Sequence, residues 1–227
     1  MAALPLDLER FGQKISSQND EDGIIDAFFR FVPPRSKSFV EFGIGPNWLD
    51  PAYVHGLEGN CCQLRENGWS GLFMDGGDHP IRFNVKKEYI TPFNVNSLFE
   101  KYDIPRDVDV VSIDVDGHDI WIWLALIYQP QLLIIEYNSN FKYGVSCAIP
   151  YDKRYNWDGT RYYGASFSAM EKVGESKGYH PVYCNGVNIF FALKASLENW
   201  RQFEPSKVFR QQDIHQADPA ARPFVEI

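Results

Sequence analysis

Short apolar runs alternate along this chain with longer stretches of helical patterning, and this alternation restricts its fold more than any other feature. Runs with the length of strands lie at 38–43, 71–75, 109–114 and 132–136, with a weaker one at 89–93. The runs at 109–114 and 132–136 are apolar enough to be buried on both faces, which is typical of parallel sheets. We therefore expect an α/β fold built on a mostly parallel sheet.

Three helices are predicted between and after these runs. The first begins after Ser17 or Asp20, either of which is a reasonable cap. The second spans 120–128, where an apolar segment is ended by Pro130, and the third spans 166–176. Their placement between strands supports the α/β prediction.

A hairpin is expected after the last helix. Apolar runs at 180–184 and 188–192 flank the Asn-Gly dipeptide at 185–186, which is typical of tight turns. With the five earlier runs they make a seven-stranded sheet, mostly parallel, with a C-terminal antiparallel hairpin. The 227-residue chain suits a single domain, with its core over about 15–193. The polar tail at 194–227 is expected to pack loosely.

Composition and charge exclude several classes of partner. The net charge of −8 repels phosphate backbones, so nucleic acid is not expected to bind. No segment reaches the roughly 18 apolar residues of a membrane span, and the first residues lack the basic start and apolar run of a secretory signal. The four cysteines form no CxxC pair, which favours free thiols in a cytoplasmic protein.

The first predicted strand leads into a glycine turn. Such a turn lets a ligand approach the backbone at the start of the next helix, although similar turns also serve plain packing. Trp48 stands where a dinucleotide fingerprint has its third glycine, and a carboxylate precedes the turn. The cofactor-binding residues expected here are Glu41, Gly43, Gly45 and Asn47.

Carboxylates follow four of the predicted strands. They are Glu41, Asp75, Asp114 with Asp116, and Glu136. Ligands of open α/β sheets bind outside the carboxyl ends of the strands, so we expect these acids along one edge. A pyrophosphate there would be repelled by about 1–4 kcal/mol for each close like-charged pair. S-adenosylmethionine carries a sulfonium and an ammonium, so the charge pattern favours this methyl donor over a nicotinamide cofactor.

Individual roles follow from this placement. Asp75, followed by Gly76, is expected to accept hydrogen bonds from ribose hydroxyls, or else to be a turn residue. Asn94 and Asn96 are candidates for contact with adenine and equally for turn formation or helix capping. The alternative for Glu41 is a carboxylate that accepts hydrogen bonds from loop amides.

Five motifs, in this order and spacing, resemble the FkbM-like branch of class I methyltransferases. They are Ser17-Gln-Asn-Asp-Glu-Asp22-Gly23, Phe39-Val-Glu-Phe-Gly43, Asn67-Gly-Trp-Ser-Gly71, Ser112-Ile-Asp-Val-Asp116-Gly117 and Ile135-Glu-Tyr-Asn138. The resemblance covers about 15–193 and implies a Rossmann-like class I fold. It also implies an S-adenosylmethionine-dependent O-methyltransferase that acts on a hydroxyl of a sugar, glycan or glycosylated small molecule. The interval before Asp75 is longer than usual in that branch, which predicts an insertion around 49–60.

The densest polar cluster is the segment from Asp114 to Asp119. It lacks the terminal glutamate of a calcium loop, so that interpretation is rejected. Asp114 is expected to contact the methyl donor. His118 is a candidate general base, because a neutral imidazole can take a hydroxyl proton, and Asp116 is the second catalytic candidate. Alternatively, Asp119 caps the following helix and His118 is structural.

A metal site is a further interpretation of the same strand ends. Asp114 with Glu136 and Asn138 would offer hard oxygen ligands that suit Mg²⁺, which would lower the pKa of a substrate hydroxyl.

The segment 141–163 is predicted to be a long loop over the site. Long loops in compact domains are often lids or binding loops, and aromatic faces pack on sugar rings. Lys153, Arg154 and Arg161 are available for a phosphate or carboxylate on the substrate. The alternative is a loop folded back by its own tyrosines. The aromatic residues are Phe141, Tyr143, Tyr151, Tyr155, Trp157, Tyr162 and Tyr163.

Two other classes remain open. A nicotinamide-dependent oxidoreductase is disfavoured by the missing third glycine and the acidic rim. A non-catalytic binding protein on the same fold is the other alternative, because a fold does not determine a function.

Overall fold

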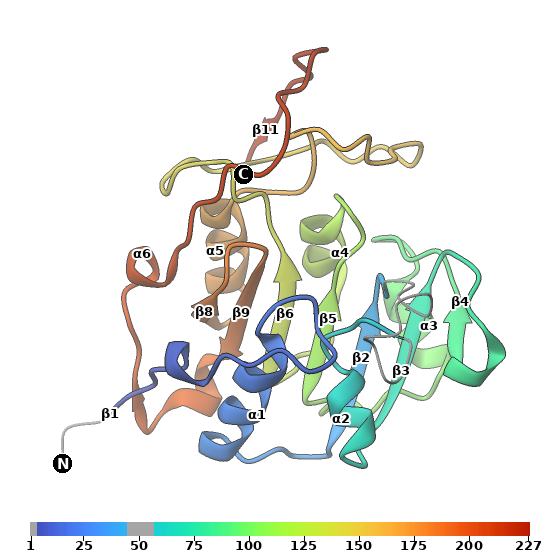
Figure 1. Ribbon diagram of the computed structural model, residues 1–227, viewed down its shortest axis with the longest axis vertical. Coiled ribbons are helices and arrows are strands. Elements are labelled where there is room, and N and C mark those ends of the chain that lie inside the picture. The colour runs from blue at the N-terminus through green and yellow to red at the C-terminus, as the bar shows by residue number, and fades with distance from the viewer. Residues whose placement is uncertain (1–3, 45–56) are drawn as a thin grey trace.

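The computed structural model describes residues 4–44 and 57–227. In this part of the chain, seven strands form one sheet in the order β4-β3-β2-β5-β6-β9-β8 (Figure 1). The strands are β2 (Ser38–Phe42), β3 (Ser70–Asp75), β4 (Val85–Lys87), β5 (Val110–Ile113), β6 (Leu132–Glu136), β8 (Tyr179–Cys184) and β9 (Asn188–Leu193). The five strands from β4 to β6 are parallel, whereas β9 is antiparallel to both β6 and β8. The predicted α/β fold, its mostly parallel sheet and the C-terminal hairpin are confirmed.

The third predicted strand was misplaced. It is β4 at Val85–Lys87, whereas residues 89–93 form the entry to the next helix. Tyr89 and Phe93 are exposed, so their apolar character does not mark a buried strand. As an edge strand, β4 needs little apolar content, and its lysines are typical of sheet edges.

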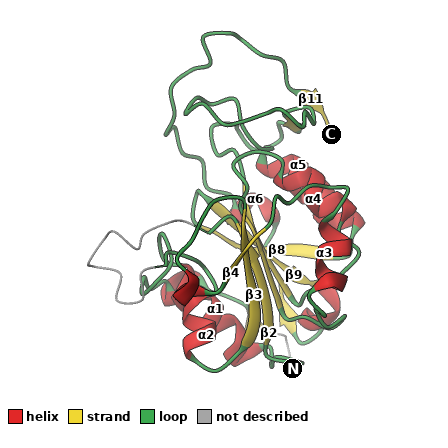
Figure 2. Ribbon diagram, turned by 90° about the vertical axis from the view of Figure 1, so that its right-hand side faces the viewer, coloured by secondary structure: helices red, strands yellow, loops and turns green. Residues whose placement is uncertain are grey.

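Helices cover both faces of the sheet (Figure 2). One face carries α1 (Glu21–Phe31) and α2 (Cys62–Glu66), and the other carries α3 (Val95–Lys101), α4 (Asp119–Ala125) and α5 (Phe167–Ser176). Strand side chains alternate between two cores. On β2, Val40 and Phe42 pack in the α3–α5 core, while Phe39 packs in the α1–α2 core.

The predicted helices exist, with adjusted ends and caps. Asp20 occupies the position before α1 but makes no capping hydrogen bond, because its carboxylate binds Tyr183 and Asn185. The second helix ends at Ala125, three residues earlier than predicted, and the chain is extended from Leu126. Ser166 caps α5 by accepting a hydrogen bond from the Ala169 amide.

The C-terminal tail is tied to the long loop, contrary to the expected loose packing. In the tail, α6 (Pro205–Val208) is followed by β11 (Val225–Glu226), which pairs antiparallel with β7 (Cys147–Ala148) in the loop. The loop and the tail lie together beyond the carboxyl ends of β5 and β6 (Figure 1), and we call them the lobe, residues 139–165 and 209–227. The lobe therefore adjoins the edge where ligands of such sheets bind.

The remaining short elements lie around the sheet. They are β1 (Leu4–Pro5), which pairs with β10 (Trp200–Arg201), and the 3-10 turns η1 (Glu9–Phe11), η2 (Ile81–Phe83) and η3 (Lys194–Leu197). Over residues 4–44 and 57–227, no helix has the length and apolar character needed to cross a membrane.

Candidate functional site

Two adjoining cavities lie at the carboxyl edge of β2, β3 and β5. Their volumes are about 450 Å³ and about 510 Å³. Both cavities are lined by Gly43, Asp75, Gly77, Asp114 and Asp116, so they form one continuous cleft. The sequence prediction that the strand-end acids meet at this edge is therefore confirmed for these three aspartates.

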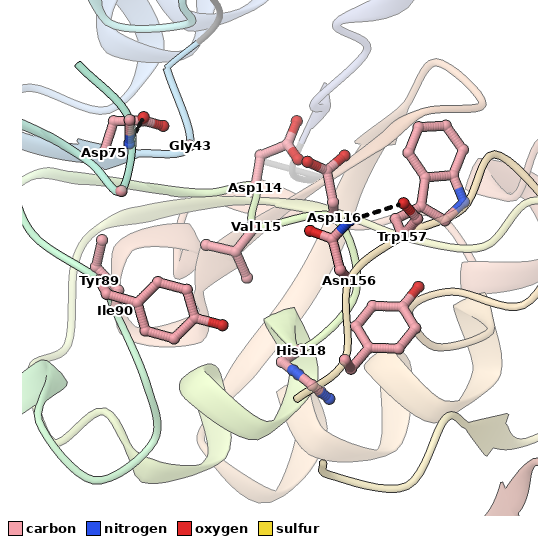
Figure 3. A pocket seen from close by; sticks show the side chains of 13 residues that line it. Gly43, Asp75, Tyr89, Ile90, Asp114, Val115, Asp116, His118, Asn156 and Trp157 are labelled. Atoms are coloured by element: carbon pink, nitrogen blue, oxygen red, sulfur yellow. Dashed lines mark hydrogen bonds between the residues drawn. The ribbon is translucent and has the colours of Figure 1, made fainter. Parts of the chain in front are cut away.

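The cleft is acidic. Among the described residues that line it, none is a lysine or an arginine. Asp114 and Asp116 project their carboxylates toward the same side of the cleft (Figure 3). Burial, Asp119 and Asp116 hold the pKa of Asp114 well above its usual range, and burial with Asp75 raises the pKa of Asp116. Such a cleft favours cationic ligands over anionic ones.

Gly43 is required by packing at this edge. Its φ is +83°, and a Cβ there would lie 1.2 Å from the Asp114 carbonyl oxygen. The turn after β2 thus passes directly against the end of β5, which only a glycine allows. The two other turn residues predicted to bind the cofactor, Gly45 and Asn47, lie outside the described residues, as does most of the predicted insertion.

Glu41 lies at the floor of the cleft and is 3 % exposed. Its carboxylate accepts hydrogen bonds from the backbone amides of Asn60 at 2.7 Å and Cys61 at 2.8 Å, at the start of α2. Burial raises the pKa of Glu41 to about 7, although both amides oppose the shift. The structure therefore gives Glu41 the alternative role, a carboxylate bound to loop amides, in a position that still borders the cleft.

One carboxylate oxygen of Asp75 closes a turn, and the other has no donor in the described part of the chain. Its Oδ1 accepts a hydrogen bond from the Gly77 amide at 2.6 Å and lies 3.2 Å from Nε2 of His79. In the described part of the chain no donor reaches Oδ2, so this oxygen is free to accept from a ligand. Gly76, next to it, is exposed and lines the cleft.

Asn94 and Asn96 have structural roles and neither lines the cleft. Asn94 accepts from the amide and hydroxyl of Thr91 and donates to the Tyr89 carbonyl. Asn96 joins α3 to α4, because its amide donates to the Ala125 carbonyl and accepts from the Ile127 amide. The geometry favours the turn-forming interpretation over contact with adenine.

A tight turn after β5 brings Asp119 back to the strand end. Asp116 has a φ of +55°, and Asp119 accepts from the amides of Val115 at 2.9 Å and Gly117 at 3.0 Å. Asp119 was predicted to cap the following helix. Its carboxylate instead closes the turn before α4 through these two amides. Burial raises the pKa of this carboxyl to about 7, against the effect of its amide donors.

His118 lines the cleft, but its hydrogen bond and its ring contacts are made with residues of the lobe. Its Nε2 accepts a hydrogen bond from the Asp152 amide at 3.3 Å, and its ring packs on Tyr151 and Tyr155. Burial lowers its pKa, which favours the neutral imidazole. As a general base, His118 would first have to release the Asp152 amide, so Asp116, which is exposed at the cleft, is the more accessible of the two catalytic candidates.

The predicted metal ligands are only partly brought together. Carboxylate oxygens of Asp114, Glu136 and Asp119 lie within 4.8 Å of one another. Asn138, the expected third ligand, is used by the lobe: its amide donates to the carbonyls of Arg161 and Tyr163, and its oxygen accepts from Asn140. Asp119, which was not among the predicted ligands, lies with the other two carboxylates.

The lobe closes the cleft with aromatic side chains. Tyr155, Asn156 and Trp157 line it together with Asp116 (Figure 3). Two of the three basic residues predicted for an anionic substrate are paired within the lobe, since Arg154 pairs with Asp152 and Arg161 pairs with the tail residue Asp213.

The sequence did not indicate that the tail supports this loop. Arg222 donates to Asp158, Thr160 and Asp218, and its guanidinium lies over the Tyr162 ring. Such contacts join segments about sixty residues apart, and no local pattern predicts them.

Comparison with known proteins finds no family model, curated protein or solved structure that matches the chain. Fold and site together define an α/β protein with an acidic cleft at the carboxyl edge of a mostly parallel sheet. The functional assignment rests on the chemistry of that cleft.

Proposed function

We propose that this chain is an S-adenosylmethionine-dependent O-methyltransferase of the Rossmann-like class I type. Its acceptor would be a hydroxyl of a sugar, a glycan or a glycosylated small molecule. The observation that carries the proposal is the cleft itself, which Asp75, Asp114 and Asp116 border and which no lysine or arginine lines among the described residues.

The strand arrangement supports the proposal. Five parallel strands followed by an antiparallel hairpin is the layout expected for class I methyltransferases, and the cleft lies at the carboxyl edge of the first, second and fourth of these strands in chain order. The lining of the cleft also fits, since its carboxylates, with no lysine or arginine lining it among the described residues, suit a sulfonium and an ammonium better than a pyrophosphate.

Bound in the cleft, S-adenosylmethionine would supply a methyl group on a positively charged sulfur. Asp75 would accept hydrogen bonds from the ribose hydroxyls through Oδ2. The side chains of Tyr89, Ile90 and Val115 line the same cavity and would offer a mostly apolar wall to the adenine. Asp114, which follows β5 and lines the cleft, would contact the methyl donor.

The chain's own residues would then orient the acceptor and remove its proton. The acceptor oxygen forms the new C–O bond as the S–C bond breaks, and its proton passes to a base, for which Asp116 is the accessible candidate. The rings of Tyr155 and Trp157 would hold a sugar ring over the cleft and limit the entry of water.

Calorimetry with S-adenosylmethionine, S-adenosylhomocysteine and NAD in parallel tests the proposal. We expect micromolar binding of the first two and none of NAD, because NAD would place its pyrophosphate among the acids. Tight binding of NAD with no response to the methyl donor would instead support an oxidoreductase. Binding of the donor without transfer to any hydroxyl compound would support a non-catalytic binding protein.

A further inference from the structure

Three carboxylates lie close together beneath the cleft. Asp114 follows β5, Glu136 ends β6 and Asp119 begins α4, and their oxygens lie within 4.8 Å of one another. None of the three forms an ion pair with a lysine, arginine or histidine over residues 4–44 and 57–227. Burial and mutual repulsion hold the pKa values of Asp114 and Glu136 well above their usual range.

A second observation concerns two buried oxygen atoms that no hydrogen-bond donor reaches in the described part of the chain. Asn188 is 2 % exposed, and its Oδ1 is buried without a hydrogen-bond donor. Its amide nitrogen donates to Glu21 at 3.1 Å, which defines the orientation of the amide group. On β9, Asn188 is the direct cross-strand partner of Glu136, whose Oε2 is also buried without a donor.

The side chains of Asp114, Glu136 and Asn188 lie on one face of the sheet. Successive side chains on a strand point to opposite faces. Ile113, Ile135 and Ile189, each next to one of the three polar strand positions, pack in the α3–α5 core, so Asp114, Glu136 and Asn188 point to the other face. Asn188 also lines the cleft together with Asp114. The cluster thus offers carboxylate and amide oxygens, and no proton donor in the described residues reaches the two unpartnered atoms.

We propose that Asp114, Asp119 and Glu136 bind one divalent cation of the Mg²⁺ class, with the amide oxygen of Asn188 beside them. Hard oxygen ligands are the set that Mg²⁺ and Mn²⁺ take in proteins. The two amide donors to Asp119 hold its carboxylate in place, and each of its oxygens keeps a lone pair for the ion. The inference does not rest on the proposed methyl transfer.

Binding of Mn²⁺ to the full chain, followed by electron paramagnetic resonance at pH 7.5 without any methyl donor, tests the site. We expect one ion per chain, displaced by excess Mg²⁺. Glu136→Gln and Asp119→Asn should each weaken Mn²⁺ binding at least tenfold. Asp78→Asn is the matched control, because Asp78 borders the same cleft and carries the same charge but pairs with Lys87 outside the cluster. It should change binding less than threefold.

Circular dichroism would establish that both site variants fold. The more conservative Asn188→Asp should tighten Mn²⁺ binding, because it adds a charge at the same position. Absence of Mn²⁺ binding up to millimolar concentration would overturn the proposal, as would binding that Glu136→Gln and Asp119→Asn leave unchanged. Because no methyl donor is present, this outcome is independent of whether S-adenosylmethionine binds.

Discussion

Asp75 shows how one residue can serve the fold and a ligand at once. Its Oδ1 closes the turn after β3 through the Gly77 amide, while Oδ2 has no donor in the described structure. The same pattern recurs at Asp119, whose oxygens hold the turn before α4 and also face two other carboxylates. At this scale, the turns after the strands determine where the carboxylates of the cleft lie.

Replacing Asp75 by Ala should weaken binding of S-adenosylmethionine by about 1–3 kcal/mol, because the ribose hydroxyls would lose their charged acceptor. Calorimetry on wild type and Asp75→Ala measures the difference. Glu100→Ala removes the same charge from an exposed pair on α3, away from the cleft, and should leave the affinity unchanged. Equal affinities of wild type and Asp75→Ala would contradict the ribose-binding role.

The lobe forms part of the wall of the cleft. Its loop contributes Tyr155 and Trp157 to the cleft, and its tail holds that loop through Arg222 and through the pairing of β7 with β11. A Cβ on Gly117 would lie 2.4 Å from the Tyr155 ring, so the lobe packs directly against the turn after β5. Loop, tail and turn therefore act as one structural unit.

Arg222→Ala should loosen the lobe without unfolding the sheet. The variant loses charged hydrogen bonds to Asp158 and Asp218 and the contact over Tyr162. We expect local opening to become about 1–2 kcal/mol easier, which would raise amide exchange in 150–163 roughly fivefold to thirtyfold. Hydrogen exchange read by mass spectrometry checks this, with the exposed Arg201→Ala as the control. Unchanged protection of the loop would show that the tail does not hold it.

At the scale of the whole molecule, the buried acids link stability to pH. The pKa of Glu41 rises from its ordinary value of 4.5 to about 7, so between these values the folded state holds more protons than the unfolded one. Stability from this group is full below pH 4.5 and decreases as pH rises through about 7. His118 has the opposite sign, because burial lowers its pKa.

Comparison of wild type with Glu41→Gln isolates this effect, because glutamine does not titrate. Between pH 5 and 8 in EDTA, the free energy of unfolding of wild type should fall by about 3 kcal/mol relative to the variant. Urea unfolding at several pH values measures it. Glu100→Gln, which changes an exposed group, should track wild type throughout, and a pH-independent difference for Glu41→Gln would disprove the assignment.

The sequence by itself determined the α/β class, most strands, the hairpin and the presence of acids at the carboxyl edge. These features follow from local apolar patterns and from the geometry of parallel strands, whose ends must meet at one edge. The prediction of a strand at 89–93 was wrong because the apolar side chains of Tyr89 and Phe93 are exposed.

Only the tertiary structure decided which carboxylate and amide oxygens lie close together. Asp119 lies with Asp114 and Glu136 because the turn after β5 folds back on itself, and Asn188 lies opposite Glu136 because of the register between β6 and β9. The tail reaches the loop through contacts that span about sixty residues. Register and long-range contacts of this kind depend on how whole elements pack, and no window of neighbouring residues encodes them.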